Sequence, residues 1–270
     1  MKKLFKQISH VKLLTFCLVS LGLVVSSQAD DPDKLPTAEK VMMKFTEMSG
    51  GIDKFKAIKS ITMKGKLIIP GVITGDLEVV QVMPNKVYTK AVLPGAGTET
   101  QVSNGKHAWH LSDASGSRLL KGKEMEQLQE GANLDRFTDP MNFYKEIKVI
   151  GIEDVEGEKC FKVNITKKSG DEMVEYFSVK TGMQVKSEVE FVMQAGKMNV
   201  ASFVKEYKDV DGIKLPAKTE LMVAGSKRMF EFESIEINKE VDEKLFEVPA
   251  DIKQLMEAEM KDEKGKDSDG

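Results

Sequence analysis

Two histidines stand close together in the chain, at a spacing that could bind a metal ion. His107 and His110 are separated by two residues. On a helix such side chains share one face and could hold one ion, whereas on a strand they point to opposite faces. Asn104-Gly105, directly upstream, is typical of a tight hairpin turn. We therefore predict a strand at the two histidines and no metal site.

A lone cysteine is the other candidate for chemistry. Cys160 needs a nearby histidine as base to act as a catalytic thiol, and only two histidines follow the N-terminal segment. The chain also lacks the glycine-framed serine of hydrolases, a phosphate-binding loop and a dinucleotide-binding glycine motif. The many carboxylates recur at polar strand positions, as on a solvated face. We predict no catalytic residue, no cofactor and a protein that is not an enzyme.

The first 29 residues have the composition of an export signal. Residues 1–12 carry four lysines and no acid, residues 13–25 are an apolar core, and Ser27-Gln28-Ala29 offers small residues to a signal peptidase. The apolar run is shorter than the roughly 20 residues that span a bilayer. Cleavage near Ala29 and Asp30 is therefore favoured over a membrane anchor. We expect a periplasmic protein that is not an integral membrane protein.

Length and charge limit the kinds of protein that the chain can be after cleavage. Of the 270 residues, 241 would remain after cleavage, and 36 basic residues would then face 43 acidic ones, a net charge of about −7. That sign argues against nucleic acid as a partner. With Cys160 alone remaining, no internal disulfide can form. We expect one domain over residues 30–256, followed by a disordered charged tail over 257–270.

Strand after strand alternates apolar and polar residues. Met63 and Leu67 fall on one parity and Lys64 and Lys66 on the other, as in a strand with one buried and one wet face. Turn signals of the Asn-Gly and Asp-Gly kind separate about ten such segments. Near Ser234 the parity switches, which indicates a β-bulge. The pattern predicts a mainly β (α+β) fold, a curled antiparallel sheet.

Helices are expected at two places beside the sheet. Thr37 to Ser49 has one apolar face and is followed by Gly50-Gly51, a usual helix stop. Between Lys121 and Ile147 the alternation ceases, which predicts two short helices. One covers Lys123 to Glu130, and the other begins at Asp139-Pro140.

The large apolar residues are either plain core or the lining of a ligand cavity. A sheet of about ten strands can curl into a barrel wide enough to hold a ligand. The sixteen methionines suit a flexible lining as well as irregular core gaps. The candidate ligand-binding residues are Val41, Phe45, Met63, Leu67, Val79, Trp109, Phe137, Phe143, Phe161, Val163, Phe177, Val189, Phe191, Phe203, Phe230 and Phe232.

Several segments resemble one known family. The segments are Asp154–Val163, Glu175–Met183, Tyr207–Pro216 and Phe230–Asn238, with Met83–Lys86 and Asn104–Trp109 as the matching first half. They resemble the periplasmic outer-membrane lipoprotein-sorting proteins, the LolA/LolB-like superfamily. The likeness covers roughly Ala38 to Pro249, and its motifs are turns and strand ends.

The resemblance implies a half-open antiparallel β-barrel with short lid helices and an apolar cavity that shelters acyl chains of lipoproteins. Thr37 to Ser49 and Lys121 to Ile147 would form the lid. A membrane-bound donor transporter and an outer-membrane acceptor would be partners. The best-known carriers latch lid to sheet through an arginine, and the arginines here, Arg118, Arg136 and Arg228, match no such context.

We therefore expect a non-enzymatic periplasmic carrier that binds acyl chains of lipoproteins or another hydrophobic ligand for transport or sorting to the outer membrane. The alternative is an envelope protein-interaction or sensor module of the same fold with a filled core. A third hypothesis is an enzyme acting on envelope lipids or peptides, which would require His107 or His110 beside a carboxylate or Cys160.

Overall fold

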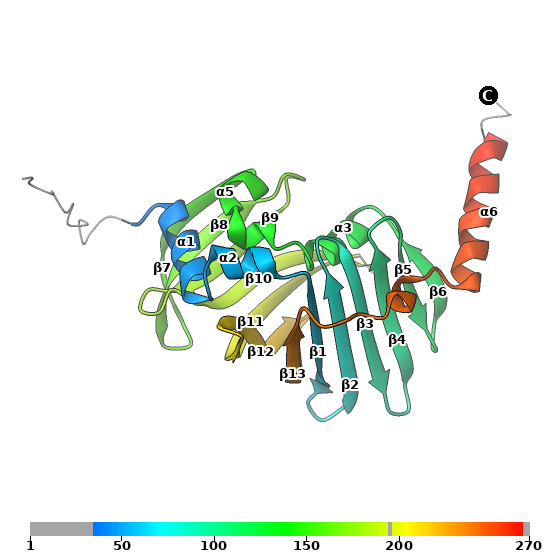
Figure 1. Cartoon of the computed structure of the whole chain (residues 1–270), viewed down its shortest axis with the longest axis horizontal. Coiled ribbons are helices and arrows are strands. Elements are labelled where there is room, and N and C mark those ends of the chain that lie inside the picture. The colour runs from blue at the N-terminus through cyan, green and yellow to red at the C-terminus, as the bar shows by residue number, and fades with distance from the viewer. Residues whose placement is uncertain (1–34, 194–195, 267–270) are drawn as a thin grey trace, which may run out of the picture. The chain divides into compact units, whose positions relative to one another are not determined.

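One antiparallel sheet of thirteen strands dominates the part of the chain that this computed structural model describes, residues 35–193 and 196–266 (Figure 1). The strands are β1 (Ser60–Ile69), β2 (Ile73–Val82), β3 (Lys86–Leu93), β4 (Gly97–Asn104), β5 (Ala108–Ser112), β6 (Gly116–Leu120), β7 (Glu146–Val155), β8 (Glu158–Thr166), β9 (Glu172–Ser178), β10 (Gln184–Met193), β11 (Gly196–Val210), β12 (Ile213–Val223) and β13 (Ser226–Ile237). Their spatial order is β6-β5-β4-β3-β2-β1-β13-β12-β11-β10-β9-β8-β7. The sheet is curled and does not close, which confirms the predicted fold class.

The strand order consists of two meanders joined in the middle. β1 to β6 pair in chain order, β7 to β13 do the same, and β13 pairs with β1. The chain must therefore pass from one edge of the sheet, β6, to the other, β7. The segment that makes this passage carries three helices. This topology brings side chains from both halves of the chain onto one side of the sheet.

The helices are short, and most belong to the segments where helices were expected. They are α1 (Ala38–Met48), α2 (Ile52–Ala57), α3 (Lys123–Glu130), α4 (Asp135–Thr138), α5 (Pro140–Phe143), the 3-10 helix η1 (Glu243–Phe246) and α6 (Ala250–Lys266). Thr37 caps the start of α1, where its hydroxyl accepts from the Lys40 amide, and the helix stops before Gly50, which takes a positive φ of 134°. Helices α2 and α4 were not predicted, because six and four residues are too few to show a helical period.

Helices α1, α2, α4 and α5 contribute to two apolar cores on one face of the sheet. We call this face, which carries Ile61 on β1 and Phe177 on β9, the inner face. Val41 and Phe45 of α1 pack against Phe177, and Phe55 of α2 packs against Ile61. Register places all these strand residues on the same face, because directly paired residues of neighbouring strands point the same way.

The segment that follows β13 packs on the opposite, outer face. Phe246 of η1 and Ile252 of α6 form a core with Trp109, Val102 and Tyr88 of β3 to β5. The outer face of the first meander is thus covered by the last part of the described chain. Among the described residues, none of the helices has both the length and the hydrophobicity needed to cross a bilayer.

Three details differ from the expectations or lie beyond them. The sheet has thirteen strands rather than about ten, since strands such as β4 carry threonine, glutamate and glutamine where an apolar parity was sought. Helix α6 runs to Lys266, so the backbone of residues 257–266 is helical where a disordered tail was expected. Glu257 and Lys261 are four residues apart, a spacing at which opposite charges stabilise a helix. The predicted export signal, residues 1–29, and the last four residues lie outside the described residues.

The predicted bulge is present where β13 meets β1. Lys64 pairs with Ser234 and Gly65 with Phe232, so Glu233 is the extra residue. A Cβ on Gly65 would lie 1.9 Å from the Glu231 carbonyl oxygen, so only glycine fits beside the bulge. The bulge restores Phe232 and Phe230 to the inner face, opposite Gly65 and Leu67.

Candidate functional site

The inner face gathers fourteen of the sixteen residues that the sequence singled out for ligand binding. Ten come from strands and four from helices α1, α4 and α5, and their position follows from strand register and from the helix contacts. They are Met63, Leu67, Val79, Phe161, Val163, Phe177, Val189, Phe191, Phe230 and Phe232 on the sheet, and Val41, Phe45, Phe137 and Phe143 on the helices.

Trp109 and Phe203 lie on the outer face instead. Trp109 is 1% exposed beneath Phe246, and its indole nitrogen is buried without a hydrogen-bond partner among the described residues. Phe203 packs near Tyr176, and the ammonium groups of Lys186 and Lys205 lie 5.4 and 5.0 Å from its ring centre. Neither side chain can contribute to a site on the inner face.

Part of the inner face is covered by the helices through a cluster of aromatic rings. The Phe45 ring of α1 lies 5.6 Å from that of Phe137 of α4 and 5.4 Å from that of Phe177 of β9, and Phe137 lies 5.5 Å from Phe55 of α2. The Thr46 hydroxyl donates to the Phe137 carbonyl oxygen at 2.6 Å. We call this part the covered zone. Its own side chains fill the space between helices and sheet.

The other part of the inner face is apolar and only half covered. We call it the open patch and define it by Leu67, Val79, Val189, Phe191, Phe230 and Phe232. Five of these side chains are half-buried, and Phe191 is 36% exposed. Register places them on one face but in different rows. In one row Leu67 pairs with Phe230, Phe230 with Thr219 and Thr219 with Val204. In another, Val189 pairs with Val200 and Val200 with Val223. A hydrocarbon chain laid on this patch would meet apolar surface across six strands, β10 to β13, β1 and β2.

A buried carboxyl group interrupts the apolar covered zone. Glu175 of β9 is 8% exposed and shares the inner face with Phe177. Burial raises the pKa of Glu175 to about 7, against the opposing influence of the Arg136 charge, a hydrogen bond with Gln184 and the Lys167 charge. Arg136 of α4 stacks over Phe137 at 4.4 Å, and its Nε is buried without a partner among the described residues. Glu175 can therefore change charge near neutral pH.

Helix α3 connects the two meanders across the inner face. On one side the Gln129 amide donates to the Ser103 hydroxyl at 3.0 Å and to the Gly105 carbonyl oxygen at 3.2 Å. On the other side the Gln127 amide donates to the Glu190 carbonyl oxygen at 3.0 Å and accepts from the Val192 amide at 3.1 Å. Gln127 thus bonds β10 in the way a neighbouring strand would.

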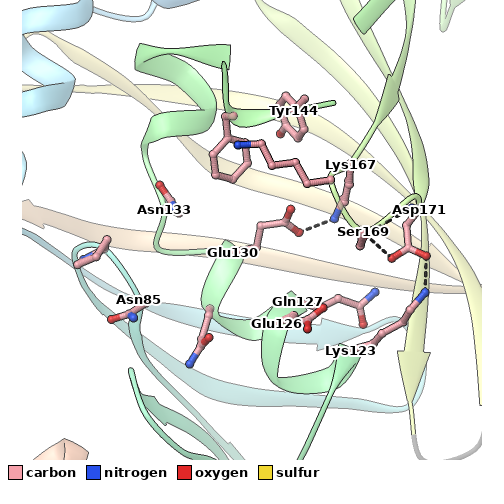
Figure 2. Close-up of a pocket in the computed structure, with 14 residues that line it drawn as sticks. Asn85, Lys123, Glu126, Gln127, Glu130, Asn133, Tyr144, Lys167, Ser169 and Asp171 are labelled. Atoms are coloured by element: carbon pink, nitrogen blue, oxygen red, sulfur yellow. Dashed lines mark hydrogen bonds and ion pairs between the residues drawn. The ribbon is translucent and has the colours of Figure 1, made fainter. Parts of the chain in front are cut away.

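None of the residues of α3 is buried, and its hydrogen bonds and ion pairs join it to neighbouring segments. Figure 2 shows Lys123 and Glu130 pointing from α3 to Asp171 and Lys167 of the β8–β9 turn, with which they form ion pairs. These groups line a cavity of about 420 Å³ whose wall also includes Tyr144. The Glu130–Lys167 pair and the two hydrogen bonds between Arg118 and Glu124 of α3 are half-buried. No residue of α3 belongs to the apolar clusters of the described residues, whereas α1 contributes Val41 and Phe45. We therefore expect α3 to be attached more weakly than α1.

A second polar group on the inner face includes one of the two histidines. His110 Nε2 lies 2.6 Å from Glu99 Oε2, and the Ser112 hydroxyl donates to Glu99 Oε1 at 2.6 Å. Ser112 also accepts the amides of Ala114 and Ser115, so it holds a turn. This pair meets the condition, a histidine beside a carboxylate, that was named for an enzyme; the Ser112 hydroxyl, however, bonds Glu99 and not His110. Cys160 is buried on the outer face, where burial raises its pKa to about 11. Among the described residues, no nucleophilic side chain is hydrogen-bonded to His110.

Sequence reasoning missed Glu175, Arg136, Gln127 and the Glu99–His110 pair. One signal was present: Glu175 has the parity of Met173 and Phe177, and a glutamate on the apolar parity of a strand marks an unusual carboxyl group. Among the described residues, no group of three or more histidine, cysteine, aspartate or glutamate side chains could hold a metal ion.

Comparison with known proteins supports the fold. No protein-family model and no curated protein matches the sequence. A solved structure of a DUF1329 family protein from Desulfovibrio piger matches with a TM-score of 0.54 at 13% identity, covering 78% of this chain and 97% of that one. A LolA superfamily protein from Nitrosomonas europaea matches with a TM-score of 0.52 at 14% identity, covering 79% and 99%. The chain therefore has the LolA-like fold, as the sequence resemblance implied.

Proposed function

We propose that this protein is a non-enzymatic periplasmic carrier that binds the acyl chains of lipoproteins or of another hydrophobic ligand on the open patch. The observation that carries the proposal is an apolar patch, half exposed on the inner face of a LolA-like sheet. An apolar surface that its own chain leaves uncovered is typical of a binding site. The many acidic side chains keep the rest of the surface hydrated.

Acyl-chain burial would supply the affinity. Each buried methylene contributes about 0.8 kcal/mol, so eight methylenes on the patch would contribute about 6 kcal/mol before the cost of association is subtracted. Such binding would be reversible, as a carrier requires. The predicted export signal supports a periplasmic location, and a membrane-bound donor and an outer-membrane acceptor would load and unload the carrier.

Helix α3 would be the movable part of the lid. It crosses the inner face and buries none of its residues, whereas α1 buries Val41 and Phe45 in the covered zone. Elements with few buried apolar contacts open at the lowest free-energy cost. We infer that loading and release proceed through displacement of α3, with α1 staying on the sheet.

The experiment uses the chain from residue 30 onward, stripped of lipid and titrated with pyrene-labelled palmitate. Phe230→Glu places a charge in the open patch and should abolish binding, because a bound acyl chain would have to remove water from the carboxylate. Phe203→Glu is the matched control, a half-buried phenylalanine on the outer face, and should bind as the unaltered protein does. Circular dichroism checks that both variants fold. No binding by the unaltered protein, or equal loss in both variants, would refute the carrier.

A second candidate is an envelope protein-interaction or sensor module. One observation favours it: in the covered zone the rings of Phe45, Phe137 and Phe55 occupy the space between helices and sheet. A module of this kind would leave palmitate unbound in the titration above. It would also show no gain in thermal stability when palmitate is added, whereas a carrier is stabilised by any ligand that binds the folded state.

A further inference from the structure

The inner face changes from apolar to polar along a single row of paired residues. Reading across the sheet from β13 to β6, each residue pairs directly with the next. The row is Ile235, Met63, Val79, Thr89, Gln101, His110 and Arg118. Strands lie about 4.8 Å apart, so the six steps of the row extend over about 29 Å. One end of the row borders the open patch, and the other is made of hydrogen-bonding side chains.

The adjacent row repeats the change. It runs Phe232, Gly65, Leu77, Ala91, Glu99 and Ser112. The first row turns polar at Thr89 of β3 and the second at Glu99 of β4. Together they define a polar floor, which we assign to Thr89, Gln101, Glu99, His110 and Arg118. A purely hydrophobic ligand would need no such floor beside the open patch.

Charges on the polar floor are already paired. Glu99 Oε2 lies 2.6 Å from His110 Nε2. The Arg118 guanidinium donates two hydrogen bonds to the Glu124 carboxylate of α3, at 2.8 and 2.9 Å. The two carboxylates, Glu99 and Glu124, stand against one guanidinium, that of Arg118. A phosphate or carboxylate placed here would find no unpaired cation and would face two carboxylates.

Uncharged hydrogen-bonding capacity remains. Gln101 and Thr89 are half-buried, and neither side chain has a hydrogen-bond partner among the described residues. Gln101 offers two donors and an acceptor, and Thr89 offers one donor and an acceptor. These two residues stand next to each other in the row, between Val79 of the open patch and His110. A ligand whose chain lies on the open patch would present its polar end to them.

We propose that the polar floor binds the headgroup of an amphipathic ligand, and that this headgroup is uncharged and rich in hydroxyl or amide groups. The inference rests on the proposed function, since it places the acyl chains on the open patch. Gln101 and Thr89 are the direct contacts. Glu99, His110 and Arg118 form the boundary that disfavours anionic headgroups.

The test compares ligands with the same chain and different headgroups at pH 8. Isothermal titration measures 1-monopalmitoylglycerol, which is uncharged, against palmitate and palmitoyl lysophosphatidylglycerol, which are anionic. We expect the uncharged ligand to bind at least fivefold more tightly than either anion. Equal or tighter binding of the anions would overturn the headgroup proposal and leave the carrier intact. Failure of all three to bind would instead refute the carrier.

Variants of the floor locate the contact. Gln101→Leu keeps the size of the side chain and removes its hydrogen bonds, so it should weaken 1-monopalmitoylglycerol about five- to tenfold and leave palmitate nearly unchanged. Phe230→Glu should abolish both. If Gln101→Leu leaves the affinity for 1-monopalmitoylglycerol unaltered, or weakens both ligands equally, the polar floor does not bind the headgroup.

Discussion

Replacing Glu175 with glutamine should stabilise the protein in a pH-dependent way. In the folded protein, burial raises the pKa of Glu175 from 4.5 to about 7. In the unfolded chain the carboxyl group is solvated and ionises near its ordinary pKa. Between these two values the folded protein holds a proton that the unfolded chain has lost. The free energy of unfolding of the unaltered protein therefore falls as pH rises from about 4.5 to about 7.

The magnitude follows from the separation of the two pKa values. Each pH unit corresponds to about 1.4 kcal/mol, so the ionised carboxylate costs the folded state about 3 kcal/mol once pH exceeds about 7. Glutamine has nearly the same shape and does not titrate. Glu175→Gln should thus match the unaltered protein near pH 4.5 and exceed its free energy of unfolding by up to about 3 kcal/mol at pH 8.

Urea denaturation at pH 5, 6, 7 and 8 measures the difference. Glu172→Gln is the control, because Glu172 lies on the same strand and is exposed; its effect should be small and constant with pH. A difference between Glu175→Gln and the unaltered protein that does not grow from pH 5 to pH 8 would refute the reasoning. So would a variant that is less stable at pH 8.

Three further predictions concern α3, the bulge and the cysteine. Gln127→Ala removes both hydrogen bonds between α3 and β10, so hydrogen exchange over 123–130 should accelerate while the melting temperature changes little; unchanged exchange would contradict the weak attachment of α3. Gly65→Ala should lower the free energy of unfolding by several kcal/mol, because its Cβ would collide with the Glu231 carbonyl oxygen, and a urea midpoint equal to that of the unaltered protein would disprove the close contact. Cys160 should resist iodoacetamide at pH 8 until denaturant is added, since its thiol is buried with a raised pKa; rapid labelling of the folded protein, read by mass spectrometry, would argue otherwise.

Local patterns predicted much of the fold because they are read along the chain. Thr37 and Gly50 placed α1, the segment Lys123 to Glu130 was identified as a helix, and the parity switch near Ser234 located the bulge. Alternation along a strand shows that its two faces differ in polarity. It does not show which face of that strand lies on the same side of the sheet as a given face of another strand. Trp109 has the apolar parity of its own strand and yet lies on the outer face, because η1 and α6 return to cover it.

The polar features of the inner face were harder to foresee, since they depend on contacts between distant segments. Glu99 and His110 meet only because β4 and β5 pair in one register. Gln127 is one of several polar residues on a short helix, and its contact with β10 depends on how the chain passes between the edges of the sheet. Glu175 and Arg136 influence one another across α4 and β9. None of these distances has a signature in the sequence.

The pairing of β13 with β1 has a consequence for how the molecule assembles. Ile61 and Ile237 are partners although nearly the whole sheet lies between them in the chain. Each meander can form from hairpins as it emerges, but the row that joins Leu67 to Phe230 has to wait for the final strand. Long-range pairings of this kind are slow to form. If the chain is exported, the apolar surface around Leu67 and Phe230 would form only when synthesis and translocation are nearly complete. A chain that ends before β13 would lack the strand pairing that joins the two meanders.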